Sequence, residues 1–370
     1  MKQNRSNAPR EALFHVTKRA SMPAWQAWSV RGIGVLLALL ANALFLYVFV
    51  GLDPVEAYTT LFKGAFGNSI YTRDTLIFTS KLLCIAVALA PAFKMRFWNI
   101  GAEGQVLMGA LTSAYIKINF SSLPTVALIL VMFVMSMLVG AVWGLIPAVF
   151  KAQFNTNETL FTLMMNYVAI QLVQFFYNGW KGAKPSLGRI NASSKAGYLP
   201  ALFGEKYAIN FIVVAALVVL MFFYLKRTKQ GYEIAVVGES QNTARYAGIN
   251  VKKTIIRTMI ISGAICGLCG FLTVSGQEHT IASNTAGGYG FTAIIVAWLA
   301  KFNTFGMVAV SMFIVALERG TNLIANNFSS FNASASKIVI GIILFFVIGS
   351  EFFINYKLNF RTSKKEAAHE

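Results

Sequence analysis

Long apolar stretches separated by short polar breaks run through most of this chain. The first stretch, residues 32–52, contains no charged residue and would span roughly 32 Å as a helix, which is enough to cross the hydrocarbon core of a bilayer. The ten apolar stretches are residues 32–52, 82–93, 102–116, 123–150, 159–180, 207–225, 258–277, 288–300, 302–317 and 338–355. This pattern predicts an all-α polytopic membrane protein with about ten transmembrane helices.

A cleaved secretory signal is the alternative interpretation of the first stretch. Residues 32–52 are longer than the apolar core of such a signal, and the following sequence GLDPVEAY offers no small-x-small cleavage site. We therefore expect an uncleaved first span. The chain then divides into a basic N-terminal tail (1–31), a transmembrane domain (32–356) and a C-terminal tail (357–370).

The composition is that of a membrane protein rather than of a soluble domain. Of the 370 residues, 56% are hydrophobic and only 12% are charged, about half the charged share of a soluble domain. The formal net charge of +18 could indicate a nucleic-acid partner. However, the basic residues lie in tails and loops, where a membrane protein faces anionic lipid headgroups. We therefore expect contact with membrane lipid and no nucleic acid.

The distribution of Lys and Arg also predicts an orientation. With ten spans and the N-terminus inside, about two thirds of the 32 basic residues fall on the cytoplasmic side. The two tails and the loop at residues 226–257 supply most of them, whereas the basic segment at 181–206 falls on the opposite side, against the trend. We expect both termini to be cytoplasmic.

Two apolar regions are interrupted in a similar way, which predicts short broken helices. Residues 82–116 contain the break FKMRFWNIGAEGQ, and residues 288–317 contain the break KFNTFG. Interrupted segments in corresponding halves of a transporter indicate its central pathway and an internal repeat, which is inverted if residues 82–93 correspond to the seventh span. The alternative, that Gly and Pro only loosen helix packing, stays open.

The sequence lacks the usual motifs of several catalytic and metal sites. It contains no GxxxxGK[ST] phosphate loop and no HExxH zinc motif. Cys266 and Cys269 have CxxC spacing, but no second pair or nearby His completes a zinc site, so we interpret them as packing residues. Gly263, Gly267 and Gly270 in the same segment predict close helix contacts inside the bundle. We expect no metal and no cofactor on this chain.

Ionisable residues are costly inside a membrane, at roughly 2.5 to 3.5 kcal/mol each at mid-span. Glu103, Glu278 and Glu318 all lie near the ends of proposed spans, where we expect them to reach water. This placement provides no buried proton relay, which disfavours a proton-coupled secondary carrier.

Uncharged polar residues on one predicted span indicate a path for a solute. Those within residues 159–180 are Asn166, Gln171, Gln174 and Asn178. With Tyr167 they would line a neutral, partly aromatic path, which suits an uncharged solute with hydrogen-bonding edges and a flat ring. Helix–helix hydrogen bonds, worth under about 1 kcal/mol each, are the alternative role and stay open.

The longest predicted cytoplasmic loop, at residues 226–257, contains a short helix. Ser240 is placed to cap the start of a helix over residues 242–247, and Gly248 is placed to end it. The surface of this helix would carry Glu239, Arg245 and Tyr246. Such a helix is typical of a docking surface for a soluble partner, although a solvated loop is the alternative.

Several segments together resemble a known family. They are NIGAEGQVLMGA (Asn99–Ala110), NETLFTLMMNYVA (Asn157–Ala169), GYEIAVVGESQNTARYAGI (Gly231–Ile249) and GGYGFTAIIVAWLAKFN (Gly287–Asn303). The combination is similar to the permease subunits of bacterial ABC importers, in the nucleoside or simple-sugar branch that is related to ribose and branched-chain amino-acid permeases. The likeness covers about residues 80–350. Its first motif includes Asn99, Gly101, Glu103, Gly104 and Gln105.

The resemblance implies an ABC importer permease fold, partners and a place in a bacterial cell membrane. The chain would pair with a second, related permease, an ABC ATPase would dock beneath it, and a lipid-anchored binding protein would deliver solute. ATP and Mg²⁺ would be held by the ATPase, so this chain would itself be no enzyme. The coupling segment that meets the ATPase would include Glu239, Asn242, Arg245, Tyr246 and Gly248.

The resemblance and the neutral path together predict translocation of a neutral solute, with nucleosides as the first choice. A simple-sugar permease of the ribose type is the nearest alternative, and an ATP-independent secondary carrier is a further one. A membrane-embedded prenyl transferase would need paired Asp motifs, and Asp53 and Asp74 are the only aspartates, so this class is excluded.

Overall fold

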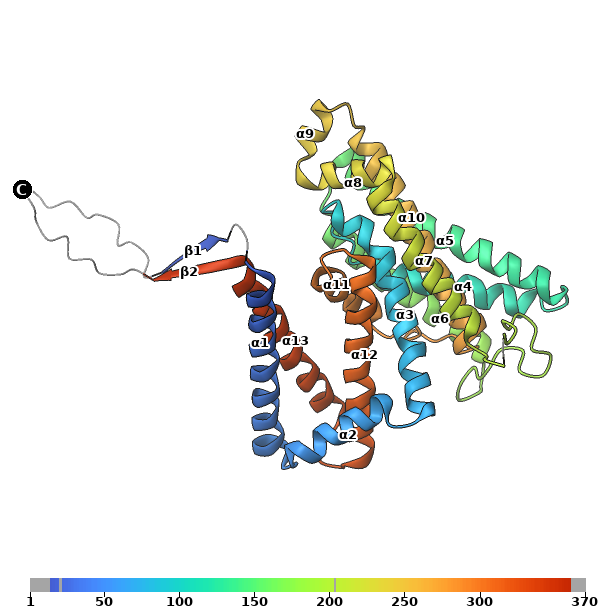
Figure 1. Cartoon of the computed structure of the whole chain (residues 1–370). Helices are drawn as coiled ribbons and strands as arrows, with labels where there is room; N and C mark the ends of the chain where they lie inside the picture. Colours follow the sequence, from blue (N-terminus) through green and yellow to red (C-terminus); the bar gives the residue numbers. More distant parts are fainter. Residues whose placement is uncertain (1–13, 20–21, 203, 361–370) are drawn as a thin grey trace, which may run out of the picture. The chain divides into compact units, whose positions relative to one another are not determined.

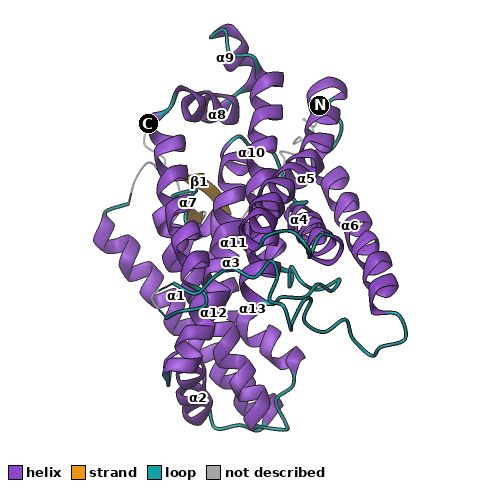
Figure 2. Ribbon diagram, turned by 90° about the vertical axis from the view of Figure 1, so that its right-hand side faces the viewer, coloured by secondary structure: helices purple, strands orange, loops and turns teal. Residues whose placement is uncertain are grey.

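The computed structural model describes residues 14–19, 22–202 and 204–360 (Figure 1). Within these residues the chain is almost wholly helical, apart from one short two-stranded ribbon (Figure 2). Helices dominate because apolar side chains run through whole stretches, and a helix satisfies its backbone hydrogen bonds internally when it is surrounded by lipid. The prediction of an all-α polytopic protein is confirmed.

The chain forms two compact units, residues 1–64 with 320–370 and residues 65–319. The first contains β1 (Phe14–Lys18), α1 (Ala24–Phe45) with a π-helical turn (Leu46–Val50), α13 (Ala333–Asn355) and β2 (Tyr356–Phe360). The second contains α3 (Ser69–Lys94), α4 (Ala102–Asn119), α5 (Thr125–Phe154), α6 (Glu158–Lys181), α7 (Ala208–Arg227), α8 (Lys229–Glu239), α9 (Gln241–Tyr246), α10 (Val251–Leu272) with a π-helical turn (Thr273–Gln277), and α11 (Tyr289–Leu299). The residues of α2 (Pro54–Phe66) and of α12 (Thr304–Asn327) are divided between the two units.

Eight helices in the described part of the chain are long and apolar enough to cross a membrane. They are α1 with its π-helical turn, α3, α5, α6, α7, α10 with its π-helical turn, α12 and α13. The other two predicted spans correspond to α4 and to α11, which has only 11 residues. The short helix predicted at residues 288–300 is therefore confirmed.

The bounds of two predicted short spans were wrong, because each span belongs to a longer helix. The stretch at residues 82–93 is the second half of the 26-residue α3, which continues through Pro91. The stretch at residues 302–317 belongs to the 24-residue α12. Lys81 delayed the predicted start of the first stretch and Glu318 brought forward the predicted end of the second, although each residue lies inside a longer helix. The internal repeat stays a prediction.

The first unit is held together by α1 packed along α13. Arg31 of α1 places Nη2 2.6 Å from Oε1 of Glu351 on α13, and the glutamate side chain is only 16% exposed. The strands β1 and β2 pair antiparallel and bring the two terminal segments together. The sequence did not predict this ribbon, because its strands come from opposite ends of the chain.

Glycines allow α10 to lie at the centre of the second unit, in contact with α4 and α5. Gly263 and Gly267 of α10 face Gly140 of α5, and Gly270 faces Gly109 of α4. A Cβ atom at any of these positions would overlap backbone atoms of the opposite helix. The predicted role of the α10 glycines in close packing is confirmed.

Gly267→Ala is expected to lower the free energy of unfolding by about 2 kcal/mol or more, because the new methyl would overlap the Ser136 carbonyl oxygen and push α5 away. The matched control is Gly341→Ala in α13, where no atom lies within 4 Å of the new Cβ. This control should gain up to about 1 kcal/mol from helix propensity. Thermal unfolding in detergent measures both, and equal shifts would contradict the packing role.

Candidate functional site

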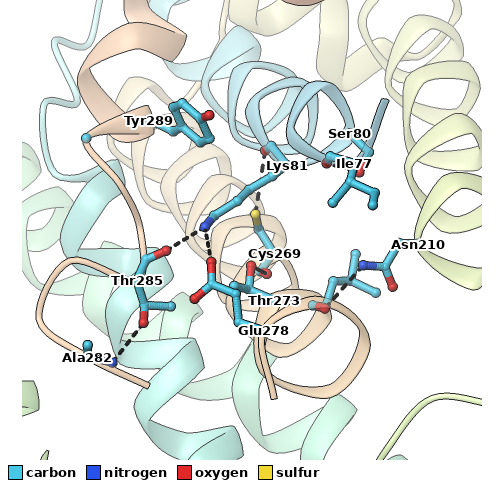
Figure 3. A network of polar contacts seen from close by, with 12 residues as sticks. Ile77, Ser80, Lys81, Asn210, Cys269, Thr273, Glu278, Ala282, Thr285 and Tyr289 are labelled. Atoms are coloured by element: carbon cyan, nitrogen blue, oxygen red, sulfur yellow. Dashed lines mark hydrogen bonds and ion pairs between the residues drawn. The ribbon is translucent and has the colours of Figure 1, made fainter. Parts of the chain in front are cut away.

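The candidate site lies where α10 ends and α11 begins. Between them, residues 278–288 form an irregular segment inside an otherwise helical region. Side chains from α3 and α4 hold this segment, and Figure 3 shows the contacts made from α3. An irregular segment joined to a short helix is the arrangement that transporters place along a solute pathway.

Lys81 of α3 is the central cation of this network (Figure 3). Its Nζ lies 2.9 Å from Oε1 of Glu278 and donates to the carbonyl oxygen of Thr285 at 2.5 Å. The same ammonium lies 5.7 Å from the ring centre of Tyr289. The Lys81 side chain is 3% exposed and that of Glu278 is 28% exposed. Because a buried ammonium is costly without partners, these contacts fasten both ends of the irregular segment to α3.

Glu103 of α4 binds the start of α11. Its Oε1 accepts from the backbone N–H of Gly288 at 2.8 Å, and its Oε2 accepts from Gly290 at 2.7 Å. A carboxylate is favoured there because the free N–H groups and the dipole of a helix make its N-terminus positive. A Cβ at position 290 would overlap the backbone of Glu103, so a glycine is required for this close approach.

The expectation that the three glutamates reach water was wrong for Glu103. This residue is only 6% exposed, because α11 covers its carboxylate. Glu278 is partly exposed and is paired with Lys81. Glu318 accepts a hydrogen bond from the Tyr289 hydroxyl at 2.8 Å, so it too takes part in the polar contacts around α11. The membrane domain therefore contains a partly buried ion pair and a buried carboxylate, neither of which was predicted from the sequence.

The motif at residues 99–105 forms the end of the connection after α3 and the first turn of α4. The Asn99 Oδ1 accepts from the Gly101 N–H at 3.0 Å, and its Nδ2 donates to Gln105 Oε1 at 3.4 Å. Gly104 packs against Asn166 of α6, whose Oδ1 accepts the Gly104 N–H at 2.8 Å. These contacts fix the start of α4, and thereby the position of Glu103, which the same motif contains.

A family model described as branched-chain amino acid transport system / permease component matches residues 71–348. The chain belongs to this permease family. The matched region contains α3 to α11 and therefore the whole network around the irregular segment. With its eight helices of span length among the described residues, the protein is a multi-pass membrane permease. The family resemblance inferred from the sequence motifs is confirmed.

Relatives are similar to the permease over most of its length. A glucose ABC transporter permease protein of Haloferax volcanii is 30% identical over 353 residues, which cover 92% of each chain. A guanosine ABC transporter permease protein of Bacillus subtilis is 30% identical over 86% of this chain and 92% of its own. A nucleoside ABC transporter permease protein of Lactococcus lactis subsp. cremoris is 27% identical over 85% of this chain and 89% of its own. No solved structure matches the permease.

The predicted path residues of the permease divide between two faces of α6. Asn166 is buried against α4, with its Nδ2 donating to the Ile100 carbonyl at 2.8 Å. Gln174 donates to Asn178 at 3.1 Å on the same helix. The exposed members of the set are Tyr167, Gln171 and Asn178. Asn166 thus makes the helix–helix hydrogen bonds that were its alternative role, and a role of the exposed residues in a path stays a prediction.

The short helix predicted in the coupling loop is confirmed as α9. The Ser240 Oγ accepts from the Thr243 N–H at 3.2 Å and caps its start. Gly248 follows its end in the left-handed region, at φ +75°. The exposed side chains around it include Glu239, Asn242, Arg245 and Tyr246, of which Tyr246 is 93% exposed. The helix α8, which precedes α9, was not predicted.

A series of contacts through the end of α3 connects α8 to α11. Gly238 of α8 packs against the Lys94 carbonyl at the end of α3. In the turn that follows α3, Trp98 stacks on Trp298 of α11 with ring centres 5.5 Å apart. Phe93 meets both indole rings edge-on, at 5.8 and 6.4 Å. A displacement of α8 would therefore act on one end of α11, whose other end is bound by Glu103.

His279 at the start of the irregular segment stacks on Tyr198, with ring centres 3.8 Å apart. Burial, followed by the positive charges of Lys117 and Arg189, lowers the pKa of His279 to about 4. The ordinary pKa is near 6.5, so the unfolded chain takes up this proton more readily. The stability contributed by neutral His279 is fully present above about pH 6.5 and is lost as the pH falls toward about 4.

We therefore expect the unfolding temperature of the permease in detergent to fall between about pH 6.5 and about pH 4. The fall should be smaller in His279→Asn, because Asn carries no titratable group and tolerates the left-handed backbone at this position, φ +57°. Unfolding curves of both proteins across this pH range measure the difference. An identical pH dependence would refute the assignment to His279.

Sequence reasoning missed Lys81 because the second apolar stretch was begun directly after it. The available signal was a basic residue at the edge of one apolar stretch and an acidic residue, Glu278, at the edge of another. Two such residues of opposite charge can pair inside a bundle. Among the described residues, no group of three or more His, Cys, Asp or Glu side chains comes together as metal ligands would.

Proposed function

We propose that this chain is the membrane-spanning subunit of an ATP-driven importer and forms the translocation path for neutral solutes, with nucleosides as the first candidate. The observation that carries this proposal is the similarity, over most of the chain, to permeases named for guanosine and nucleosides. The exposed polar side chains of α6 support it, because Tyr167, Gln171 and Asn178 are uncharged hydrogen-bonding groups suited to a neutral solute.

A simple sugar is the second candidate solute. The relative named as a glucose permease is 30% identical, as is the guanosine permease, and it covers 92% of this chain. Sugars and nucleosides are both neutral and rich in hydroxyl groups, so the same kind of polar path serves either. The choice between them depends on which solute competes for uptake.

The proposal includes partners and an orientation in a bacterial cell membrane. ATP binds and is hydrolysed on a separate ATPase chain, since this sequence contains no GxxxxGK[ST] loop. A second, related permease completes the path, and a lipid-anchored binding protein supplies solute from outside. Both termini and the α8–α9 loop face the cytoplasm, in keeping with the excess of Lys and Arg in these segments.

The proposed mechanism is alternating access. Closure of the ATPase domains displaces α8 and α9, and α8 transmits this movement to the end of α3 through the contact of Gly238 with Lys94. The stacked Trp98 and Trp298 then carry it to α11. Because Glu103 binds the opposite end of α11, the helix moves as one body and changes the opening of the path beside the irregular segment.

The solute is identified by uptake of labelled guanosine into vesicles that contain both permeases, the ATPase and the binding protein, with and without ATP. An excess of unlabelled nucleosides should suppress this uptake, while pentoses and glucose should leave it unchanged. Suppression by sugars alone would favour the second candidate. Uptake by the isolated chain without ATP or an ATPase would contradict the proposed function and support a secondary carrier.

Arg245→Glu tests the coupling role of α9. Uptake should fall by about tenfold or more while ATP hydrolysis continues, because the reversed charge disturbs the surface through which the ATPase acts. The control is Gln241→Glu on the same helix, which adds a carboxylate and keeps the Arg245 guanidinium. Unchanged uptake in Arg245→Glu, with both proteins equally stable, would refute the assignment of the coupling segment.

A further inference from the structure

The coupling region contains a cavity of about 410 Å³ between α8 and α10. Its wall on α8 is formed by Lys229, Tyr232 and Glu233, and its wall on α10 by Lys253, Thr254 and Arg257. The connection from Ala247 to Asn250 closes one side. The cavity is therefore a concave surface directly beside α9. In the proposed function, α9 is the helix that contacts the ATPase.

Positive charge prevails in this cavity. Its only acidic lining residue is Glu233, and Oε2 of that residue is already paired with Nη2 of Arg257 at 2.9 Å. Lys229 and Lys253 are exposed, and neither forms an ion pair within the described chain. The unneutralised charge at the cavity is thus that of two ammonium groups on opposite walls, which are placed to receive anionic groups.

One further feature indicates that the cavity suits a protein segment. The side chain of Tyr232 is 65% exposed at the α8 wall and offers an aromatic face for packing. Exposed aromatic rings are enriched in protein interfaces, and the rims of such interfaces are polar.

We propose that this cavity receives an acidic segment of the partner ATPase, with carboxylates bound by Lys229 and Lys253 and an apolar side chain packed on Tyr232. The proposal rests on the proposed function and extends it, because the exposed helix α9 and the cavity together form a surface that both inserts into the ATPase and receives part of it. Because each protein then holds part of the other, α8 and α10 would follow the ATPase both when it approaches the permease and when it withdraws.

The experiment uses the tagged full-length permease expressed together with the second permease and the ATPase and purified in detergent. In Lys253→Glu, the ratio of ATPase to permease in the eluate should fall by about tenfold, because a carboxylate in the cavity repels the acidic segment. The matched control is Lys252→Glu, the neighbouring exposed lysine of α10, which does not line the cavity and should retain the ATPase. The neutral Lys253→Gln should give an intermediate ratio.

Salt provides a second measurement on the wild-type complex. The ATPase should dissociate progressively as sodium chloride is raised from about 0.1 M to about 1 M, since the screening length falls from about 10 Å to about 3 Å. Full retention of the ATPase by Lys253→Glu, or equal losses in Lys252→Glu and Lys253→Glu, would overturn the cavity as the binding site and leave the proposed function intact. Absence of any ATPase from the wild-type preparation would overturn the function and the cavity's occupant together.

Discussion

Glu103→Ala is expected to lower the free energy of unfolding of the permease by about 4 kcal/mol and to abolish solute uptake. The carboxylate accepts two backbone hydrogen bonds, from Gly288 at 2.8 Å and Gly290 at 2.7 Å, and is only 6% exposed. Its removal leaves two N–H groups at the start of α11 without this acceptor, of which that of Gly288 is partly buried and that of Gly290 is buried. The helix would then lose its fixed position in the path.

The conservative variant Glu103→Gln removes the negative charge of the side chain and keeps nearly the same shape. Its amide keeps one oxygen as an acceptor, but the NH₂ group faces a backbone donor, so about half of the stability loss should remain. Thermal unfolding in detergent and ATP-driven uptake are measured for the same preparations. Near wild-type stability of Glu103→Ala would mean that other contacts hold the start of α11.

Breaking the ion pair at the irregular segment should have the second largest effect. Among the described residues, Glu278→Ala leaves the Lys81 ammonium, which is 3% exposed, with the Thr285 carbonyl as its one hydrogen-bond acceptor. The expected loss of stability is about 3 kcal/mol, because an uncompensated charge remains buried. Lys81→Met should cost less, since Glu278 is 28% exposed and water can solvate it.

The double variant Lys81→Met/Glu278→Ala should recover part of the stability lost in Glu278→Ala, because it removes the buried charge together with its partner. A double-mutant cycle on unfolding in detergent measures the coupling between the two residues. The control pair is Arg73 with Glu205, whose side chains are 45% and 50% exposed at a distance of 3.6 Å. Removal of that pair should cost under about 1 kcal/mol, and a similar cost at Lys81 would refute the role of burial.

The sequence determined the features of this permease that depend on local pattern. The apolar stretches specify helices that cross a membrane, since length and hydrophobicity alone decide whether a segment fits a bilayer. The cap and end of α9 were readable for the same reason, because Ser240 bonds a backbone group only three residues away and Gly248 acts on its own dihedral angles. The close helix packing at the α10 glycines was also predictable, because small residues within a span commonly mark positions where two helices approach closely.

Only the tertiary structure decided where the polar side chains inside the bundle point. Lys81 and Glu278 are separated by 197 positions in the chain, and Asn166 bonds a backbone group 62 positions away. No local pattern distinguishes a glutamate near a span end that reaches water from one that is covered by another helix. Packing of α11 against α4 made that choice for Glu103, since the position of a buried charge is fixed by the partner that compensates it.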